Sequence, residues 1–227
     1  NLQDFSSSIQ SVQLQRGVWT STNGAGAFGA SLNILTDAAT LEAYAEVNAS
    51  GGSFDTRRAN VKFGTGLIND HFTFSGRLSA IKSDGYVDRA SSDLKSYYLQ
   101  GEYRNEKTLL KAVVFGGHEV TYQSWNGIDA QTLATDRTYN PIGFQYDDDG
   151  NFEGFYDNQV DDYKQDHVQL HWNQKYGGGW STQLSLNYTM GRGFFEEYVD
   201  SWYYANVNFS SDATFFFIGW EPYFFFF

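Results

Sequence analysis

Three groups of residues in this chain resemble, in residue type and spacing, sites that bind a cofactor or a metal ion. Gly24, Gly26 and Gly29 match the GxGxxG pattern that brings a backbone turn close to the pyrophosphate of a dinucleotide. Such a site needs a buried apolar strand before the glycines and a helix after them. Here the preceding strand is polar at alternate positions, and residues 32–36 after them are strand-like. We therefore expect the glycines to permit close backbone packing, not nucleotide binding.

The other two groups are polar. His167 and His171 could share a metal ion on a helix, but on a strand they lie about 13 Å apart. Asp147, Asp148 and Asp149 lack the alternating ligand spacing and the closing glutamate of an EF-hand calcium loop. We expect two polar residues of a strand and a solvated loop tip, and no metal site. No local signature places a Ser-His-Asp set, so the sequence does not predict an enzyme.

Composition narrows the class of protein. The net charge of -12 argues against nucleic acid as a partner, and the absence of cysteine excludes disulfides and thiolate zinc sites. No run of 18 apolar residues could form a transmembrane helix. A mean hydropathy of -0.48 fits a soluble protein, but also a membrane barrel whose strands alternate apolar and polar residues. Aromatic residues at 19% and 23 glycines against 2 prolines favour a β-protein.

From residue 41 onward apolar and polar residues alternate with a period of two, which predicts β-strands. The runs cover about 7–11 residues, close to the length of about 9–11 residues that a tilted strand needs to cross a bilayer. The expected strands fall within 43–49, 59–67, 72–80, 97–103, 167–173 and 180–190, and 108–116 is apolar on both faces. In the last run we expect the apolar residues to face lipid and the polar ones a lumen. The apolar residues are Leu184, Leu186 and Tyr188, and the polar ones are Gln183, Ser185 and Asn187.

Beyond the first hairpin at 51–56, the connections alternate in length. Short turns at 68–71, 104–107 and 176–179 alternate with long polar segments at 84–93, 119–164 and 191–200. Outer-membrane barrels have short periplasmic turns, long extracellular loops and aromatic residues at the interfaces. Such aromatic residues flank the short turns, namely Phe72, Tyr103, Trp172 and Trp180. A soluble β-sandwich or lipocalin-like barrel would also alternate, but nothing in it would sort the loops by length.

The segment Ile9 to Thr36 reads IQSVQLQRGVWTSTNGAGAFGASLNILT. It resembles the last part of the plug domain of TonB-dependent outer-membrane receptors, where an EVxRGP strand precedes a GxxAxGGxINIxT stretch; Val18 stands where the family often has proline. Two further stretches resemble Bacteroidetes-type receptors and extend the resemblance to about residue 198. They are Tyr139-Asn140-Pro141 with Tyr156-Asp157-Asn158, and Gly191 to Tyr198.

The resemblance implies an all-β fold: part of a transmembrane antiparallel β-barrel of about 22 strands, with the C-terminal end of an N-terminal plug domain. Residues 1–37 would end the plug, and 38–227 would form the N-terminal portion of the barrel. Because no signal peptide is visible, we expect a mature chain that is a piece of a longer protein. The phenylalanine-rich residues after about 200 are atypical. We do not interpret them as a closing strand, since seven or eight strands cannot close around a plug.

For function, the resemblance implies an importer of a scarce, large ligand in the bacterial outer membrane. A ferric siderophore is the first expectation, followed by cobalamin, haem or an oligosaccharide. The partners would be the TonB complex of the inner membrane, outer-membrane lipid and a surface lipoprotein, with no cofactor. The alternative is a non-energised barrel that acts as an adhesin or passive pore. The plug motif favours the importer, because a passive pore gains nothing from a filled lumen.

The same resemblance suggests site residues. The plug apex before the Arg-Gly strand faces the ligand in the family, which indicates Gln3, Asp4 and Phe5. The long polar segment adds Trp125 and Tyr139, because long loops on a rigid scaffold commonly carry recognition. The structural motif of the plug comprises Arg16, Gly17, Gly24, Gly26, Gly29 and Asn33. We expect the planar guanidinium of Arg16 to pair with carboxylates of the barrel wall.

Overall fold

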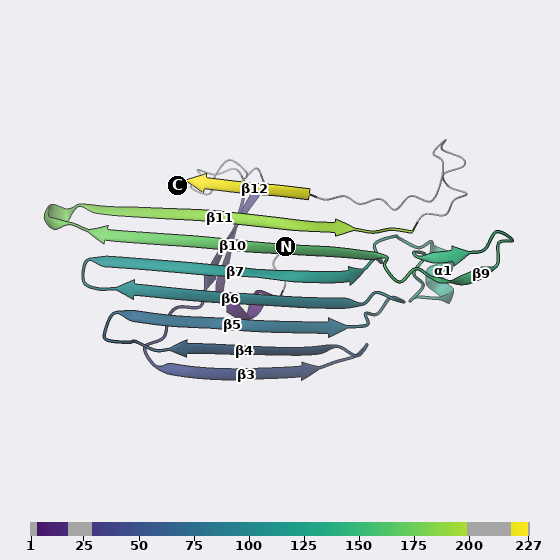
Figure 1. Cartoon of the computed structure of the whole chain (residues 1–227), viewed down its shortest axis with the longest axis horizontal. Helices are drawn as coiled ribbons and strands as arrows, with labels where there is room; N and C mark the ends of the chain where they lie inside the picture. The colour runs from purple at the N-terminus through teal and green to yellow at the C-terminus, as the bar shows by residue number, and fades with distance from the viewer. Residues whose placement is uncertain (1–3, 18–28, 199–218, 227) are drawn as a thin grey trace.

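The structure is a computed structural model, and it describes residues 4–17, 29–198 and 219–226. In these residues, eight antiparallel strands form one open sheet in the order β12-β11-β10-β7-β6-β5-β4-β3 (Figure 1). Its strands are β3 (Ala43–Gly51), β4 (Arg57–Thr65), β5 (Phe72–Ser83), β6 (Ser92–Arg104), β7 (Thr108–Tyr122), β10 (Val160–Lys175), β11 (Ser181–Phe195) and β12 (Gly219–Phe226). The all-β prediction is confirmed.

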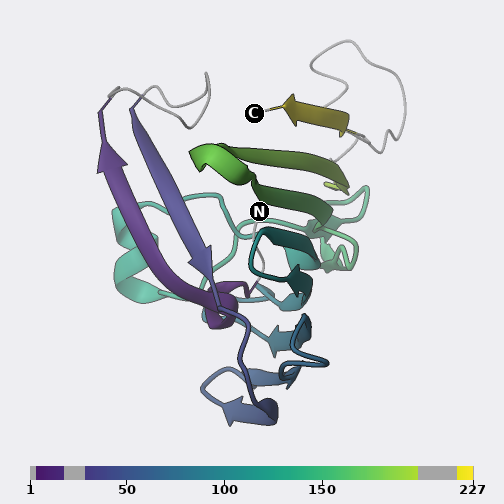
Figure 2. The same ribbon diagram turned by 90° about the vertical axis from the view of Figure 1, so that its left-hand side faces the viewer.

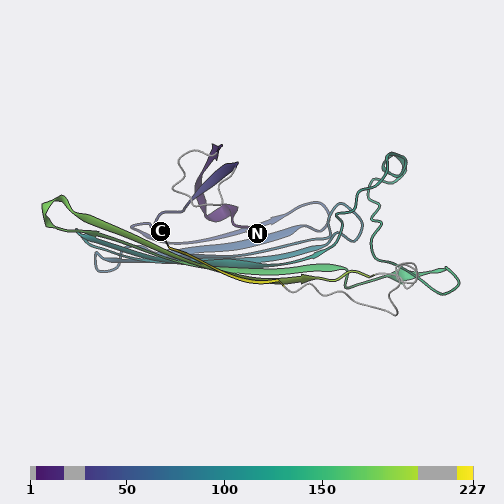
Figure 3. The same ribbon diagram turned by 90° about the horizontal axis from the view of Figure 1, so that it is seen from above.

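A separate hairpin lies on one face of this sheet (Figures 2 and 3). It consists of β1 (Ile9–Arg16) and β2 (Ala30–Thr36), preceded by the short 3-10 helix η1 (Ser6–Ser8). Gly17 closes the end of the hairpin with a φ of 92° that favours glycine, and its N–H donates to the carbonyl of Gly29 over 2.7 Å. Because Gly29 leads into β2, the helix that a dinucleotide site requires is replaced by a strand.

Beyond the first hairpin, connections at the two ends of the sheet differ in length, as predicted (Figure 1). One end carries the turns 66–71, 105–107 and 176–180, and the other carries 52–56, 84–91 and 123–159. The last of these contains α1 (Ala130–Thr135), β8 (Phe144–Tyr146) and β9 (Phe152–Phe155). It is shorter than the predicted 119–164, because β7 continues to Tyr122 and β10 begins at Val160.

The last described strand, Gly219–Phe226, pairs with β11 within the phenylalanine-rich tail that we did not interpret as a closing strand. It extends the sheet and does not close it, since β12 and β3 form opposite edges.

The two faces of the sheet are chemically distinct. We call the face that carries the hairpin the inner face and its opposite the outer face. His167 and His171 contact the hydroxyls of Thr189 and Ser185 on the inner face, each at 2.9 Å. Leu186 of the alternate set pairs across the strands with Leu170 on the outer face. This register agrees with the predicted division of residues 183–188.

The strand register also places aromatic residues beside the short turns on the outer face. Phe72 pairs with Tyr103, and their ring centroids lie 5.0 Å apart; Trp172 lies on the same face. Phe72 and Trp180 are 40% and 76% exposed, so the outer face presents apolar surface to its surroundings. Among the described residues, no helix is long and apolar enough to span a membrane.

Candidate functional site

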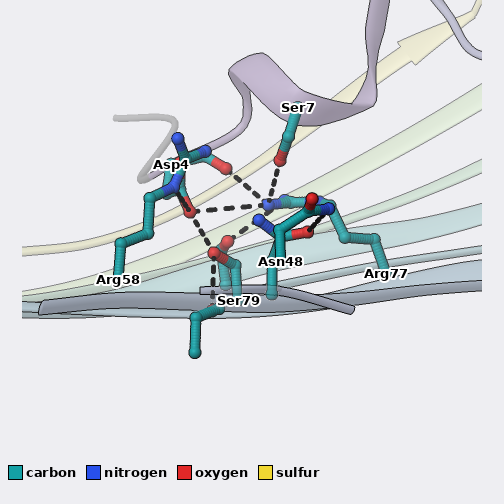
Figure 4. Close-up of polar contacts among 9 residues, drawn as sticks. Asp4, Ser7, Asn48, Arg58, Arg77 and Ser79 are labelled. Carbon is teal, nitrogen blue, oxygen red and sulfur yellow. Dashed lines mark hydrogen bonds and ion pairs between the residues drawn. The ribbon is translucent and has the colours of Figure 1, made fainter. Parts of the chain in front are cut away.

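The contact between the N-terminal segment and the sheet is centred on Asp4 (Figure 4). Its carboxylate, with a side chain only 4% exposed, lies 2.6 Å from the Arg58 guanidinium and 3.8 Å from that of Arg77. The hydroxyl of Ser79 donates to the same carboxylate. Asp4 itself has a φ of 42°, a conformation that aspartate tolerates better than most residues. Two neighbouring strands, β4 and β5, thus supply one binding position for an acidic side chain.

Arg77 is the deepest cation of this contact, with a side chain 2% exposed. Its guanidinium donates to the main-chain carbonyl of Asp4 at 2.5 Å, to Ser7 Oγ at 3.0 Å and to Ser96 Oγ at 3.1 Å. A buried charge is tolerated only when it is paired and hydrogen-bonded. The N-terminal segment supplies the counter-charge, so sheet and segment depend on each other.

Apolar packing continues the contact beside Asp4. Phe5 is 6% exposed, and its ring packs at 5.8 Å from Tyr98 and 5.0 Å from Phe115. The Tyr98 hydroxyl donates to Thr36 Oγ1 at 2.9 Å and so connects β6 with the end of β2. Both ends of the described N-terminal segment are therefore held on the inner face.

A cavity of about 630 Å³ lies between the hairpin and the sheet. The hairpin lines it with apolar residues of β2, including Leu32 and Ile34. The sheet contributes polar groups, among them Lys111, His167 and His171. The sheet also contributes Val113 and Phe115, so the cavity is lined by both apolar and polar groups.

A second polar cluster lies where the long connections leave the sheet. Glu196, 8% exposed, accepts hydrogen bonds from the Tyr156 hydroxyl and the Asn158 amide. Gln123 donates through Nε2 to the carbonyl of Glu196 at 2.9 Å, and Gln159 donates to Gln123 at 3.0 Å. The residues of the Tyr156 and Gly191–Tyr198 motifs thus converge on one site that fastens the long loop to β11.

Asn140 and Arg89 extend this cluster to the neighbouring loop. The amide of Asn140, 1% exposed, donates to the carbonyls of Asp88 and Gln123, both at 3.0 Å. Arg89 donates to the Asn140 carbonyl at 2.6 Å, and its guanidinium lies 3.7 Å from the centroid of the Phe155 ring. The motif residues therefore hold the connections 84–91 and 123–159 together at the end of the sheet.

Low pH should weaken this hydrogen-bonded cluster around Glu196. Hydrogen bonds from Asn158 and then Tyr156 lower the pKa of the Glu196 carboxyl, so its stabilisation is complete above the unfolded value of about 4.3 and is lost as pH falls through the lower folded pKa. We expect Glu196→Gln to cost about 1–3 kcal/mol near neutral pH and to remove this dependence. Hydrogen exchange of the 123–159 amides between pH 3 and 7 measures both. The same acid dependence in wild type and variant would contradict the assignment.

The predicted site residues fall into separate places. Gln3, Gly24 and Gly26 lie outside the described residues. Asp4 and Phe5 lie together on the inner face, but their side chains are engaged by the sheet.

The remaining predicted residues are more accessible. Trp125 and Tyr139, 58% and 36% exposed, belong to the connection at the long-loop end, apart from Asp4 and Phe5. Arg16 is exposed and forms no ion pair within the described residues. Asn33 pairs with Gln13 in the hairpin.

Sequence reasoning missed the arginines that carry the contact, Arg58 and Arg77. The sequence does distinguish Arg77: it lies on one face of β5, where the other polar residues are serine and threonine. A long cationic side chain among small hydroxyl side chains indicates that its partner belongs to another part of the molecule and not to the sheet. The expected pairing of Arg16 with carboxylates of the wall is not among the ion pairs of the described residues. In the contact at Asp4 the sheet supplies the cations and the N-terminal segment supplies the acid.

Comparison with protein-family models and with curated proteins found no match. Solved structures do match. The ferripyoverdine receptor of the outer membrane of Pseudomonas aeruginosa is 17% identical with a TM-score of 0.62, over 84% of this chain and 25% of that one. The pyoverdine receptor FpvA of P. aeruginosa PAO1 is 16% identical with a TM-score of 0.64, over 85% and 28%. The ferric-catecholate import receptor Fiu of E. coli K12 is 14% identical with a TM-score of 0.60, over 80% and 26%.

The chain spans about a quarter of the length of these structures. At this identity the likeness concerns the fold. It agrees with the architecture found here, a row of long antiparallel strands with a small hairpin domain on the inner face. The chain therefore has the fold of part of a receptor barrel together with part of its plug.

Proposed function

We propose that the chain is part of a TonB-dependent receptor of the bacterial outer membrane that imports a scarce, large ligand. The observation that carries this proposal is the docking of the hairpin on the inner face through the buried Asp4–Arg77 contact. A segment fixed in this way would obstruct the lumen, which an importer needs and a passive pore or adhesin does not. In this reading residues 1–37 end the plug and 38–227 begin the barrel wall, with the long loops outside the cell.

The preferred ligand is a ferric siderophore, because the similar solved structures are receptors for ferripyoverdine and ferric catecholates. Cobalamin, haem and an oligosaccharide are the other ligands that we considered. Trp125 and Tyr139 are the proposed residues of first contact, since they are exposed on the long connection. Asp4 and Phe5 would become available to a ligand only when the N-terminal segment leaves the wall.

Energy for that movement would come from TonB and the inner membrane, because the buried contact offers no local energy source. A surface lipoprotein that delivers ligand to the loops is a further proposed partner. We propose a transporter and not an enzyme, because the similar solved structures are receptors for siderophores.

Uptake measurements test this proposal. Cells that depend on the full-length protein for iron should accumulate radiolabelled ferric siderophore, and a protonophore should abolish that accumulation. A strain without the gene sets the background, and binding to cells in the cold separates capture from transport. Accumulation that continues unchanged after the proton-motive force has collapsed would rule out the importer and favour the passive pore.

A further inference from the structure

The outer face of the sheet changes character along its length. In each of β6, β7, β10 and β11, the four outward positions on the short-turn side of the first outward basic residue hold apolar, aromatic or glycine residues, apart from Asp166. The carboxylate of Asp166 accepts a hydrogen bond from Tyr97 at 2.8 Å. Thr108, Gln174 and Thr182 lie beyond these positions, at the short-turn end. The four strands thus share one apolar band that ends at the same register.

Directly beyond the band, the next outward position is basic in all four strands. Lys95 pairs with His118, His118 with Lys164, and Lys164 with Arg192. Neighbouring strands lie about 4.8 Å apart, so this basic row covers about 14 Å of the outer face. In a chain with a net charge of -12, four consecutive cross-strand positions of this type form a distinct surface.

Nearby carboxylates neutralise the basic row only in part. Asp93 is shared by Lys82 at 2.9 Å and Lys95 at 3.6 Å, and Lys164 lies 3.9 Å from Asp166. His118 has a carboxylate of its own, since its Nε2 lies 2.8 Å from Asp162. Arg192 is exposed and has no ion pair in the residues that the structure describes.

The cations also protrude further than the acids. The side chains of Lys95 and Lys164 are 62% and 37% exposed, against 29% for Asp93 and 25% for Asp166. Donors of Lys95, Lys164 and Arg192 are therefore available to an anion that approaches from outside the sheet.

We propose that the basic row binds the phosphate groups of a phosphorylated lipid in the leaflet on the long-loop side of the membrane. This inference rests on the proposed outer-membrane location. The apolar band would contact the acyl chains, and the long basic side chains would extend along it to the headgroups. Each lysine or arginine near an anionic surface contributes about 1 kcal/mol, so three of them would give a lipid preference of about a hundredfold.

Binding of diphosphoryl lipid A to the purified full-length protein in neutral detergent tests this inference. The triple variant K95Q/K164Q/R192Q should bind it about a hundredfold more weakly than the wild type. The control R104Q/K107Q/K175Q removes the same number of charges at the short-turn end and should bind as the wild type does. An unchanged thermal midpoint without lipid shows that each variant is folded, and R192Q alone replaces the triple variant if that one is not.

Other outcomes overturn the inference. An equal loss in both triple variants would mean that only the overall charge matters. Equally tight binding of zwitterionic phosphatidylcholine would mean that the net negative charge of the headgroup is not recognised. Displacement of the lipid by millimolar inorganic phosphate would indicate a site for the free ion. Because the assay involves no transport, its failure leaves the uptake result unaffected, and a failed uptake test leaves lipid binding measurable.

Discussion

Replacing Asp4 by alanine is expected to weaken the docking of the N-terminal segment by about 3–5 kcal/mol. The variant leaves the 2% exposed Arg77 side chain without its carboxylate, in a place that water cannot reach readily. The cost is mostly that of an unpaired buried charge, because the guanidinium keeps its bonds to Ser7 and Ser96. Asp4→Asn keeps the shape and part of the hydrogen bonding, so a smaller loss is expected.

Hydrogen exchange in β1 and β2 measures this effect, because an isolated two-stranded hairpin is marginally stable and opens once it is undocked. The expected loss corresponds to exchange faster by about a hundredfold to a few thousandfold. Asp37→Ala is the matched control. The side chain of Asp37 is 43% exposed and pairs with Lys62 at 3.0 Å, so removing it should cost less than about 1 kcal/mol. Equal effects of the two substitutions would show that burial does not govern the contact.

The strands were predictable because a sheet with one polar and one apolar face requires polar and apolar residues to alternate along each strand. Polar Ser185 and apolar Leu186 were assigned to their faces for this reason. The sorting of loops was predictable because turn length is a local property. The pattern missed the ends of β7 and β10, at Tyr122 and Val160, because charged residues such as Asp161 and Asp162 interrupt the apolar residues there.

The contacts that hold the N-terminal segment could not be predicted. Asp4 and Arg77 are separated by 73 residues, and the Ser79 contact by 75. Their meeting depends on where the segment rests on the sheet, which no local spacing encodes. The loop motifs were recognised only as a resemblance, and the convergence of Asn140, Tyr156 and Glu196 explains physically why these residue types are required.

Replacing Leu186 by arginine is expected to destabilise the membrane-inserted protein by about 2–4 kcal/mol if the residue lies near the bilayer midplane. Leu186 lies on the outer face within the apolar band, beside Leu170 of β10 and four residues before Met190. A guanidinium placed there must either lose its hydration or draw water and headgroups into the hydrocarbon. Its neighbour Asn187 lies on the inner face, in register with Gln169. Asn187→Arg therefore introduces the same charge one residue away, where the lumen can hydrate it.

Urea unfolding of the full-length protein from lipid vesicles compares the two variants, and Leu186→Ala separates the loss of apolar area from the added charge. The alanine variant should cost less than the arginine variant, because it removes methyl groups without placing a charge in lipid. Equal costs for Leu186→Arg and Asn187→Arg would contradict the assignment of faces. That result would also weaken the lipid-binding inference, since the basic row at Lys95 and Arg192 shares the face of Leu186.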